Sequence, residues 1–373
     1  MDKNYLGAIS TLVGTIIGAG ILGIPYIIAK SGFVAGLIQI VLIGIMVLVV
    51  NLLLGEVVLR TQGNHQLTGY ADRYLGKKGK IIMMFSMILG NYGAMIAYLI
   101  GEGQTLGAVF NFNQMFFTIL FFAVFSIFVY KGLKAVEASE SVLMIFKMLL
   151  FITIFLLIIF SGHFNIRNLT HLDIKNMFLP YGVILFAYLG ASAIPEVKEE
   201  LKKNTKLIKK AILIGTLIPI AVYSLFALGV VGLTGIRTTE IATIGIGNLL
   251  GEGILLIVNL FAIVSMATGF LAIALALKEM YQYDFKINKH LAWIITCFVP
   301  LILVFLGVKD FISIIGLTGA IAGSMEGCLI VLMYYKARKT GKRKPEYSIG
   351  LWKPIGYAIM ALFIAGGLLT ILM

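Results

Sequence analysis

Charged residues are scarce in this chain. Asp, Glu, Lys and Arg make up 13% of its 373 residues, and 60% of the residues are hydrophobic. An average soluble domain carries about 25% charged residues. The mean hydropathy of +1.01 points the same way. Since so few charges do not cover the surface of a soluble domain of this size, the composition indicates a polytopic membrane protein.

Cysteine and histidine are scarce too, which excludes several kinds of chemistry. Cys297 and Cys328 both fall within apolar runs, so a disulfide framework is not expected. The four histidines fall in loops or at the ends of apolar runs, and neither an H-E-x-x-H zinc motif nor a P-loop occurs. No filter-like segment or ring of charge suggests a channel, and no signal-peptide pattern is visible. We therefore expect no enzyme, no ATP-driven transport, no metal and no cofactor.

Long apolar runs are what the sequence has in abundance. A membrane helix needs about 20 apolar residues, and eleven such runs occur, which predicts eleven transmembrane helices. No loop is long enough for an extramembrane domain. The segment Glu240–Leu250 is either a short external helix or a plain connecting loop. The runs lie near residues 5–29, 33–59, 81–106, 115–130, 138–161, 177–197, 207–233, 251–277, 291–307, 311–335 and 352–373.

The basic residues follow the loops rather than a nucleic-acid surface, although the net charge is +13. Most of them fall on loops that share one side with the N-terminus. The positive-inside rule makes that side cytoplasmic, so the N-terminus is predicted inside and the C-terminus outside. The exceptions are Lys147, which lies within a run, and the opposite loops, which carry Lys30, Arg167, Lys175, Arg237 and Lys309.

The first apolar run contains a break. Four glycines and Pro25 interrupt it between Gly14 and Tyr26, although glycine costs roughly 1 kcal/mol and proline about 3 kcal/mol inside a helix. Non-helical backbone at membrane depth persists only where it is buried in protein or lines a cavity. Gly18, Ala19 and Gly20 are therefore predicted to form an unwound segment whose backbone groups bind a ligand, as in secondary transporters.

The sixth run is irregular as well. Pro180 and Pro195 bound it, and Gly190 and Ser192 precede the second proline. Pro180 suits a first helical turn, whereas Pro195 should disrupt the preceding turn. Two broken helices five runs apart indicate an inverted repeat with its site between the breaks. The alternative is that Gly and Pro are simply more frequent in membrane helices.

These residues resemble those of a known superfamily. The stretch Gly14–Ile21 is similar to the first-helix signature of the amino acid–polyamine–organocation superfamily, and its continuation Leu22–Tyr26 resembles the amino acid/auxin permease and aromatic amino acid permease branches. Phe186–Tyr188, followed by Glu196, Glu199 and Glu200, is similar to the sixth-helix pattern. Eleven spans also fit the aromatic permease branch.

The resemblance implies where an amino acid would bind. Its carboxylate would meet the amides of Gly18, Ala19 and Gly20, which agrees with the affinity of helix N-termini for anions. Its ammonium would meet carbonyls around Thr15 and Ile16 and at Phe186, Ala187 and Tyr188, and Gly190 would leave room for the side chain. Tyr188 is equally well explained as packing.

Lys147 is the one basic residue deep inside an apolar run. A lysine at the centre of a span costs about 2.5–3.5 kcal/mol. One explanation is snorkelling toward the headgroups. The resemblance offers another, because proton-coupled members carry a fifth-helix lysine where sodium-coupled relatives hold an ion between helices one and eight. Burial favours neutral lysine, and Gly269 beside Thr268 replaces one of two hydroxyl residues typical of sodium sites. Lys147, with Ser265 and Thr268, therefore predicts proton coupling or uncoupled exchange.

Several other polar groups lie within the runs. Glu326 either relays protons or faces a wet inner vestibule, and Glu102 lies near the outer end of the third run. Glu56 and Arg60 are spaced as a helical ion pair. The third run also carries Asn91, Tyr92 and Tyr98, where relatives contact the substrate side chain.

The sequence therefore predicts an all-α polytopic membrane protein with a LeuT-type 5+5 inverted repeat. Residues 1–161 and 162–337 would form the two repeats, and residues 338–373 a basic inner loop plus an extra helix. The predicted function is amino acid import across the cytoplasmic membrane by alternating access, with coupling to protons predicted from Lys147. The alternative is an amino acid sensor that resembles germinant-receptor membrane subunits. The expected partners are an amino acid, protons and the lipid bilayer, with no nucleic acid and no obligatory protein partner.

Overall fold

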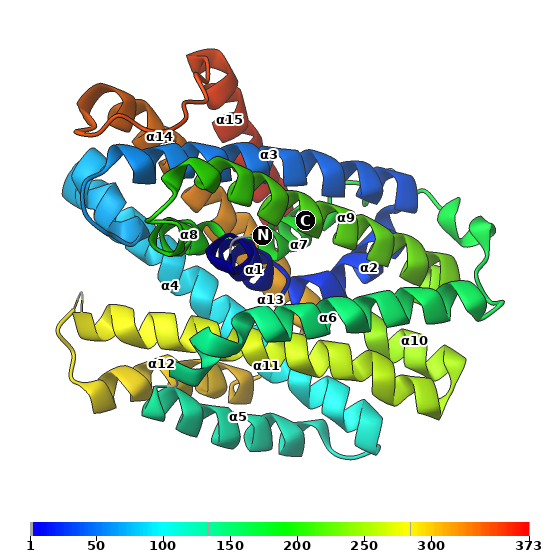
Figure 1. Ribbon diagram of the computed structural model, residues 1–373. Coiled ribbons are helices and arrows are strands. Elements are labelled where there is room, and N and C mark those ends of the chain that lie inside the picture. The colour runs from blue at the N-terminus through cyan, green and yellow to red at the C-terminus, as the bar shows by residue number, and fades with distance from the viewer. Residues whose placement is uncertain (1–2, 133, 284, 373) are drawn as a thin grey trace.

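The computed structural model describes residues 3–132, 134–283 and 285–372, almost all of them in helices packed as one bundle (Figure 1). The side chains of residues 134–141 and 283 lie outside that description. The principal helices are α1 (Lys3–Ile16), α2 (Gly20–Ser31), α3 (Phe33–Arg60), α4 (Leu67–Phe110), α5 (Gln114–Lys131), α6 (Lys134–Phe160), α7 (Pro180–Ala187), α8 (Ile194–Glu200), α9 (Ile208–Thr234), α10 (Ala242–Leu250), α11 (Glu252–Tyr283), α12 (Lys289–Phe305), α13 (Phe311–Thr318), α14 (Ser324–Thr340) and α15 (Lys353–Leu372).

The predicted spans reappear as these helices. In the described part of the chain, nine helical segments are long and apolar enough to cross a membrane, and the bent pair α1–α2 makes a tenth. The helix α12 is apolar but only 17 residues long. The count of eleven therefore stays a prediction. The segment before the eighth run forms the short helix α10. Of the two alternatives for Glu240–Leu250, the structure therefore supports a short helix and not a plain connecting loop.

Both predicted breaks are present. The axes of α1 and α2 differ by 49° across residues 17–19. In the sixth span α7 ends at Ala187, and a 3₁₀ turn, η2 (Ala191–Ala193), leads into α8. Pro195 lies at the start of α8 and not inside a disrupted helical turn. At the start of a helix the missing N–H of proline removes no helical hydrogen bond.

Two further irregularities were not predicted. In α4, Gly76 has a φ of 73°, which separates a short first helix from the long remainder. Between α13 and α14 lies a π-helix, η5 (Gly319–Gly323). At Gly319 a β-carbon would lie 2.0 Å from the carbonyl oxygen of Gly182 in α7, so this glycine permits a close backbone approach.

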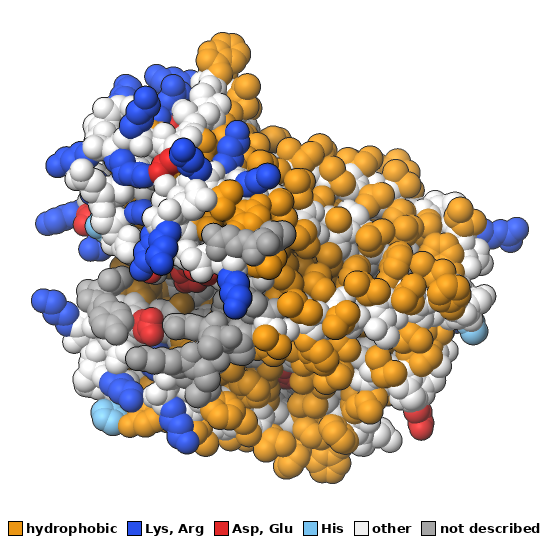
Figure 2. All heavy atoms as spheres, in the orientation of Figure 1, with side chains coloured by type: hydrophobic (Ala, Val, Ile, Leu, Met, Phe, Trp, Pro, Cys, Tyr) orange, Lys and Arg blue, Asp and Glu red, His pale blue; other side chains and the backbone are white. Residues whose placement is uncertain are grey.

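The broken helix α1–α2 occupies the centre of the bundle. In Figure 1 it lies between α3 and α9 on one side and α6 and α11 on the other, while α15 lies at the periphery next to α14. Figure 2 shows hydrophobic side chains around the middle of the molecule and most Lys and Arg at the end where α4 and α12 begin. A broad apolar surface is what a lipid-embedded bundle requires.

Candidate functional site

The two helix breaks meet in the buried centre. A β-carbon on Gly20, the first residue of α2, would lie 2.5 Å from the Ala187 Cα at the end of α7. A β-carbon on Gly190 would lie 2.4 Å from Cγ1 of Ile16 at the end of α1. Glycine at both positions therefore permits a close approach of the two breaks, as the inverted repeat predicted.

Tyr223 of α9 joins the two breaks directly. Its hydroxyl lies 2.7 Å from the Ile16 carbonyl oxygen and 2.8 Å from the Ala187 carbonyl oxygen, and donates to both. The side chain is fully buried. Sequence reasoning missed Tyr223; its only signal was a hydroxyl in the middle of an apolar run.

Some backbone N–H and C=O groups of the first break already have hydrogen-bond partners within the protein. The Gly18 amide donates to the Ile16 carbonyl at 3.0 Å, and the Leu22 amide to the Ala19 carbonyl at 3.0 Å. The hydroxyl of Tyr98 in α4 lies close to the backbone of this break, at Gly18 and Ala19.

That Tyr98 hydroxyl is inserted between two glycines. A β-carbon at Gly18 would lie 2.8 Å from it, and one at Gly269 in α11 only 2.6 Å. Gly269 thus leaves space for Tyr98, a role that sequence reasoning did not foresee. Tyr92, by contrast, bonds to Tyr281 and the Ile295 carbonyl, well away from the breaks.

The predicted residues of the second break are all buried, but their side chains point in different directions. Phe186 and Ala187 end α7 and lie against α2 and η5. The Tyr188 hydroxyl donates to the Ile40 carbonyl of α3 at 3.1 Å, and its ring packs on Tyr223. Beside Gly190 the space is filled by Ile16 rather than open for a substrate side chain.

Solvent reaches the breaks on the α1 and α8 side. Thr15, just before the first break, is exposed, and so is Ser192 in the second. On the other side of the first break, Ile21, Leu22 and Ile24 of α2 are fully buried. The hydroxyl of Thr15 donates to the Thr11 carbonyl of the preceding turn at 2.8 Å. Thr15 itself lies on the accessible side of the break.

Lys147 is buried in α6, with 4% of its surface exposed. Snorkelling would leave the ammonium end at the surface, so this burial favours the other interpretation. The helix α6 packs against both α1 and α11. On α11, the Thr268 hydroxyl bonds back to the Val264 carbonyl at 2.7 Å, and the buried Ser265 hydroxyl has no hydrogen-bond partner in the described chain.

Glu326 lies beside the second break. It lines a cavity of about 20 Å³ together with Tyr188, Leu189, Gly190 and Asn51. A cavity of this size has room for about one water molecule. The carboxyl therefore faces a small cavity at the break, a placement closer to the relay interpretation than to an open vestibule.

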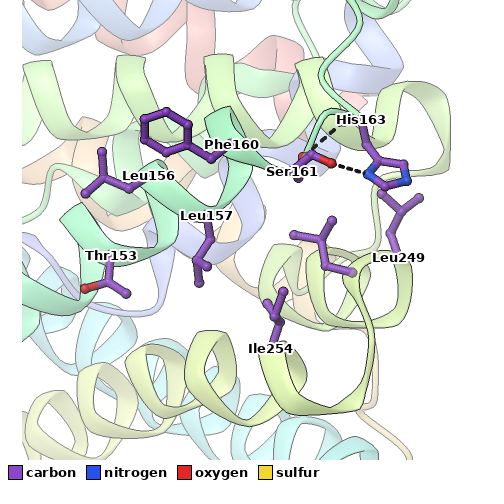
Figure 3. A pocket seen from close by; sticks show the side chains of 9 residues that line it. Thr153, Leu156, Leu157, Phe160, Ser161, His163, Leu249 and Ile254 are labelled. Atoms are coloured by element: carbon purple, nitrogen blue, oxygen red, sulfur yellow. Dashed lines mark hydrogen bonds between the residues drawn. The ribbon is translucent and has the colours of Figure 1, made fainter.

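A second hollow lies elsewhere, on the apolar surface. A groove of about 450 Å³ runs between the C-terminal end of α6 and α10–α11 (Figure 3). Its lining is mostly leucine and other apolar side chains, with Ser161 and His163 hydrogen-bonded to each other at one end. Since it contains neither unwound backbone nor a buried charge, it is not the substrate site.

Comparison with known proteins agrees with this geometry. A family model described as the tryptophan/tyrosine permease family matches residues 1–372. The chain belongs to the tryptophan/tyrosine permease family. The permease is therefore an amino acid transporter of the superfamily that its first-helix motif resembles, and not an enzyme. The family assignment also decides against the sensor alternative.

Its relatives differ in what their names say they carry. The permease is 26% identical to glutamine transporter 2 of Aliivibrio fischeri, with 86% of each chain covered. It is 25% identical to tyrosine-specific transport system 1 of Haemophilus influenzae, covering 92% of this chain and 91% of that one. To a tryptophan-specific transport protein of Shigella flexneri it is 22% identical, covering 100% and 95%.

A solved structure confirms the fold. The permease superposes on MhsT, crystallised with L-phenylalanine, with a TM-score of 0.72 over 98% of both chains at 13% identity. The predicted LeuT-type fold with broken first and sixth helices is therefore confirmed.

Proposed function

We propose that the permease imports an amino acid into the cell, holds its main chain between the paired breaks, and couples the movement to protons through Lys147. One observation carries the proposal. Backbone groups of two broken helices converge on Tyr223 in a buried centre, which is how transporters bind ionic groups without charged side chains.

The carboxylate of the substrate would approach the start of α2, where the Ala19 and Gly20 amides and the Tyr98 hydroxyl gather. An anion there is favoured by the helix N-terminus. The ammonium would use the Ile16 and Ala187 carbonyls. Both carbonyls already accept from Tyr223. The Ala187 carbonyl would offer its second lone pair to the ammonium, whereas the Ile16 carbonyl also accepts from the Gly18 amide and would have to exchange one of its donors for the substrate.

This arrangement recognises only the part that all amino acids share. The names of the relatives span glutamine, tyrosine and tryptophan, which fits a common main-chain site with a variable side-chain pocket. We propose a neutral amino acid as substrate, with tyrosine, tryptophan and glutamine as the first to test.

Lys147 is proposed as the coupling residue because it is buried between elements that include α1 and α11. Burial favours the neutral amine, so the amine can take up a proton when its surroundings become wet and release it when they close. Ser265 and Thr268 of α11 would supply polar atoms nearby.

For the orientation, we propose that the basic end of the bundle in Figure 2 faces the cytoplasm. The N-terminus is then inside, the C-terminus outside, and the exposed Thr15 and Ser192 lie on the cytoplasmic side of the breaks. We further propose residues 1–161 and 162–337 as the two inverted repeats.

The test is uptake of radiolabelled amino acid into proteoliposomes under an imposed pH gradient, with and without sodium. Wild type should accumulate substrate with the gradient regardless of sodium. Lys147→Ala should lose gradient-driven accumulation, while Lys175→Ala, which removes an exposed lysine, should not. Accumulation that requires sodium, or that persists in Lys147→Ala, would contradict proton coupling through this lysine.

A further inference from the structure

Glu102 of α4 is a carboxyl group in an unusual place. The residue has no exposed surface, and neither of its carboxylate oxygens has a hydrogen-bond partner in the described chain. Buried charges in proteins are normally paired, and an ionisable side chain within a membrane span marks a functional site by default.

Two close contacts place Glu102 relative to α11. Tyr98 of α4 meets Gly269 of α11, and Gly101 meets Met266. The residue numbers rise in one helix as they fall in the other, so the two helices run antiparallel. Glu102 follows Gly101 and lies level with Ser265, which precedes Met266.

Other buried polar atoms follow the same junction. Counting one helical turn at a time from these contacts, Thr105 and Asn259 lie beyond Glu102 and Ser265 on the side away from the breaks. We call Glu102, Thr105, Asn259 and Ser265 the α4–α11 seam. All four are fully buried, and their side-chain hydroxyl, amide and carboxyl atoms have no hydrogen-bond partner in the described residues.

Among the described residues, no cation hydrogen-bonds to the Glu102 carboxyl. The positions on either side of it, Gly101 and Gly103, face Met266 of α11, Phe311 of α13 and Thr118 of α5. Titratable groups elsewhere in the bundle include Tyr98 on α4 itself, Lys147 on α6, Asp310 before α13 and Glu240 before α10. None of them hydrogen-bonds to the Glu102 carboxyl. An ionised carboxylate here would be uncompensated, so burial favours the neutral, protonated form of the group.

The seam is connected to the helix break. Tyr98 lies one turn from Glu102 along α4, and its hydroxyl lies against Gly18 in the first break. Any movement that separates α4 from α11 therefore changes both the surroundings of Glu102 and the first break.

We propose that Glu102 is a proton-binding site of the permease, separate from Lys147. The carboxyl holds a proton while the seam is dry, as here, and releases it to water when the seam opens. The seam oxygens would then hydrogen-bond the ionised carboxylate through water. The proposal rests on transport as the function of the chain, but not on Lys147 as the coupling residue.

The first measurement is infrared spectroscopy of the purified permease in lipid nanodiscs across a pH series. A protonated carboxylic acid gives a carbonyl stretching band that disappears on ionisation. We expect such a band at neutral pH, a smaller band in Glu102→Gln, in which Glu326 can account for the remainder, and an unchanged band in Glu252→Gln, which neutralises an exposed carboxylate at the start of α11. The band should also persist in Lys147→Ala, so failure of the coupling proposal would not remove it.

The second measurement is substrate exchange without any gradient, at a series of pH values. Because Glu102→Gln imitates the protonated acid permanently, its exchange rate should lose most of the pH dependence seen in wild type and Glu252→Gln. If Glu102→Gln folds poorly, Glu102→Asp keeps the carboxyl and should keep the band. A wild type without the band, a band of unchanged size in Glu102→Gln, or a band removed by sodium at constant pH would overturn the proposal.

Discussion

The space around single α-carbons decides what the first break tolerates. At Gly20 a β-carbon would meet backbone atoms of Ala187 at 2.5 Å, and backbone cannot rotate away as a side chain does. At Gly14, in the same motif, a β-carbon would meet nothing within 4 Å. One motif therefore contains a glycine that the packing requires and one that it does not.

We predict that Gly20→Ala abolishes amino acid uptake and destabilises the fold by about 1–3 kcal/mol, the usual cost of overpacking. Gly14→Ala is the matched control and should retain uptake. Uptake per correctly inserted protein, together with thermal unfolding in detergent, measures both effects. Equal uptake by the two variants would show that the breaks are not in contact.

At this scale the sequence predicted some of the site and missed the rest. The glycines were predictable because each carries a conformational cost that a lipid-facing helix would avoid. The roles of Tyr98 and Tyr223 were not, since a tyrosine in an apolar run reveals neither its direction nor its partner. The structure directs Tyr188 toward α3, which the sequence had left open.

At the scale of elements, the segment between α14 and α15 is held tightly to α3. Glu56, fully buried in α3, accepts hydrogen bonds from the Arg60 side chain, the Ser348 hydroxyl and the Ile349 amide. Tyr347 donates to the Leu52 carbonyl at 2.8 Å. The predicted Glu56–Arg60 pair is confirmed, but it also serves this longer connection, which spacing along one helix does not show.

We predict that Glu56→Gln loosens residues 341–352, because it removes the charge from hydrogen bonds that are worth about 1.5–3 kcal/mol each. Limited trypsin digestion of inside-out vesicles should cut this basic segment faster than in wild type. Ser348→Ala, which removes one of the bonds, should have a smaller effect. Digestion at the wild-type rate in Glu56→Gln would contradict the role assigned to the carboxylate.

The presence of the spans and of the two breaks was easier to predict than the irregularities within single helices. Hydropathy fixes spans because lipid demands about 20 apolar residues, and paired Gly and Pro mark breaks. The π-helix η5 and the kink at Gly76 escaped because an isolated glycine in an apolar run has the same pattern whether the helix bends or not. The length of α12, 17 residues, shows why the number of spans is harder to fix than the fold.

At the scale of the whole molecule, the distribution of charge predicts the topology. Most Lys and Arg side chains in Figure 2 gather at one end of the bundle. An epitope tag fused to the C-terminus should therefore be labelled from outside intact cells. A tag between Lys342 and Lys344 should be labelled only after permeabilisation. The reverse pattern would invert the proposed orientation and the direction assigned to the exposed side of the breaks.

The two hydrogen bonds of the Tyr223 hydroxyl have a consequence for how the substrate is released. One hydroxyl proton serves the carbonyls of Ile16 and Ala187 together, so the two broken helices share a single, divided bond. An ammonium group placed between the same carbonyls draws on the same electron density. If the ammonium binds as proposed, the arriving amino acid weakens the link between α1 and α7 when it binds, and its departure restores that link. On this proposal the bound substrate itself changes how firmly α1 and α7 are held together.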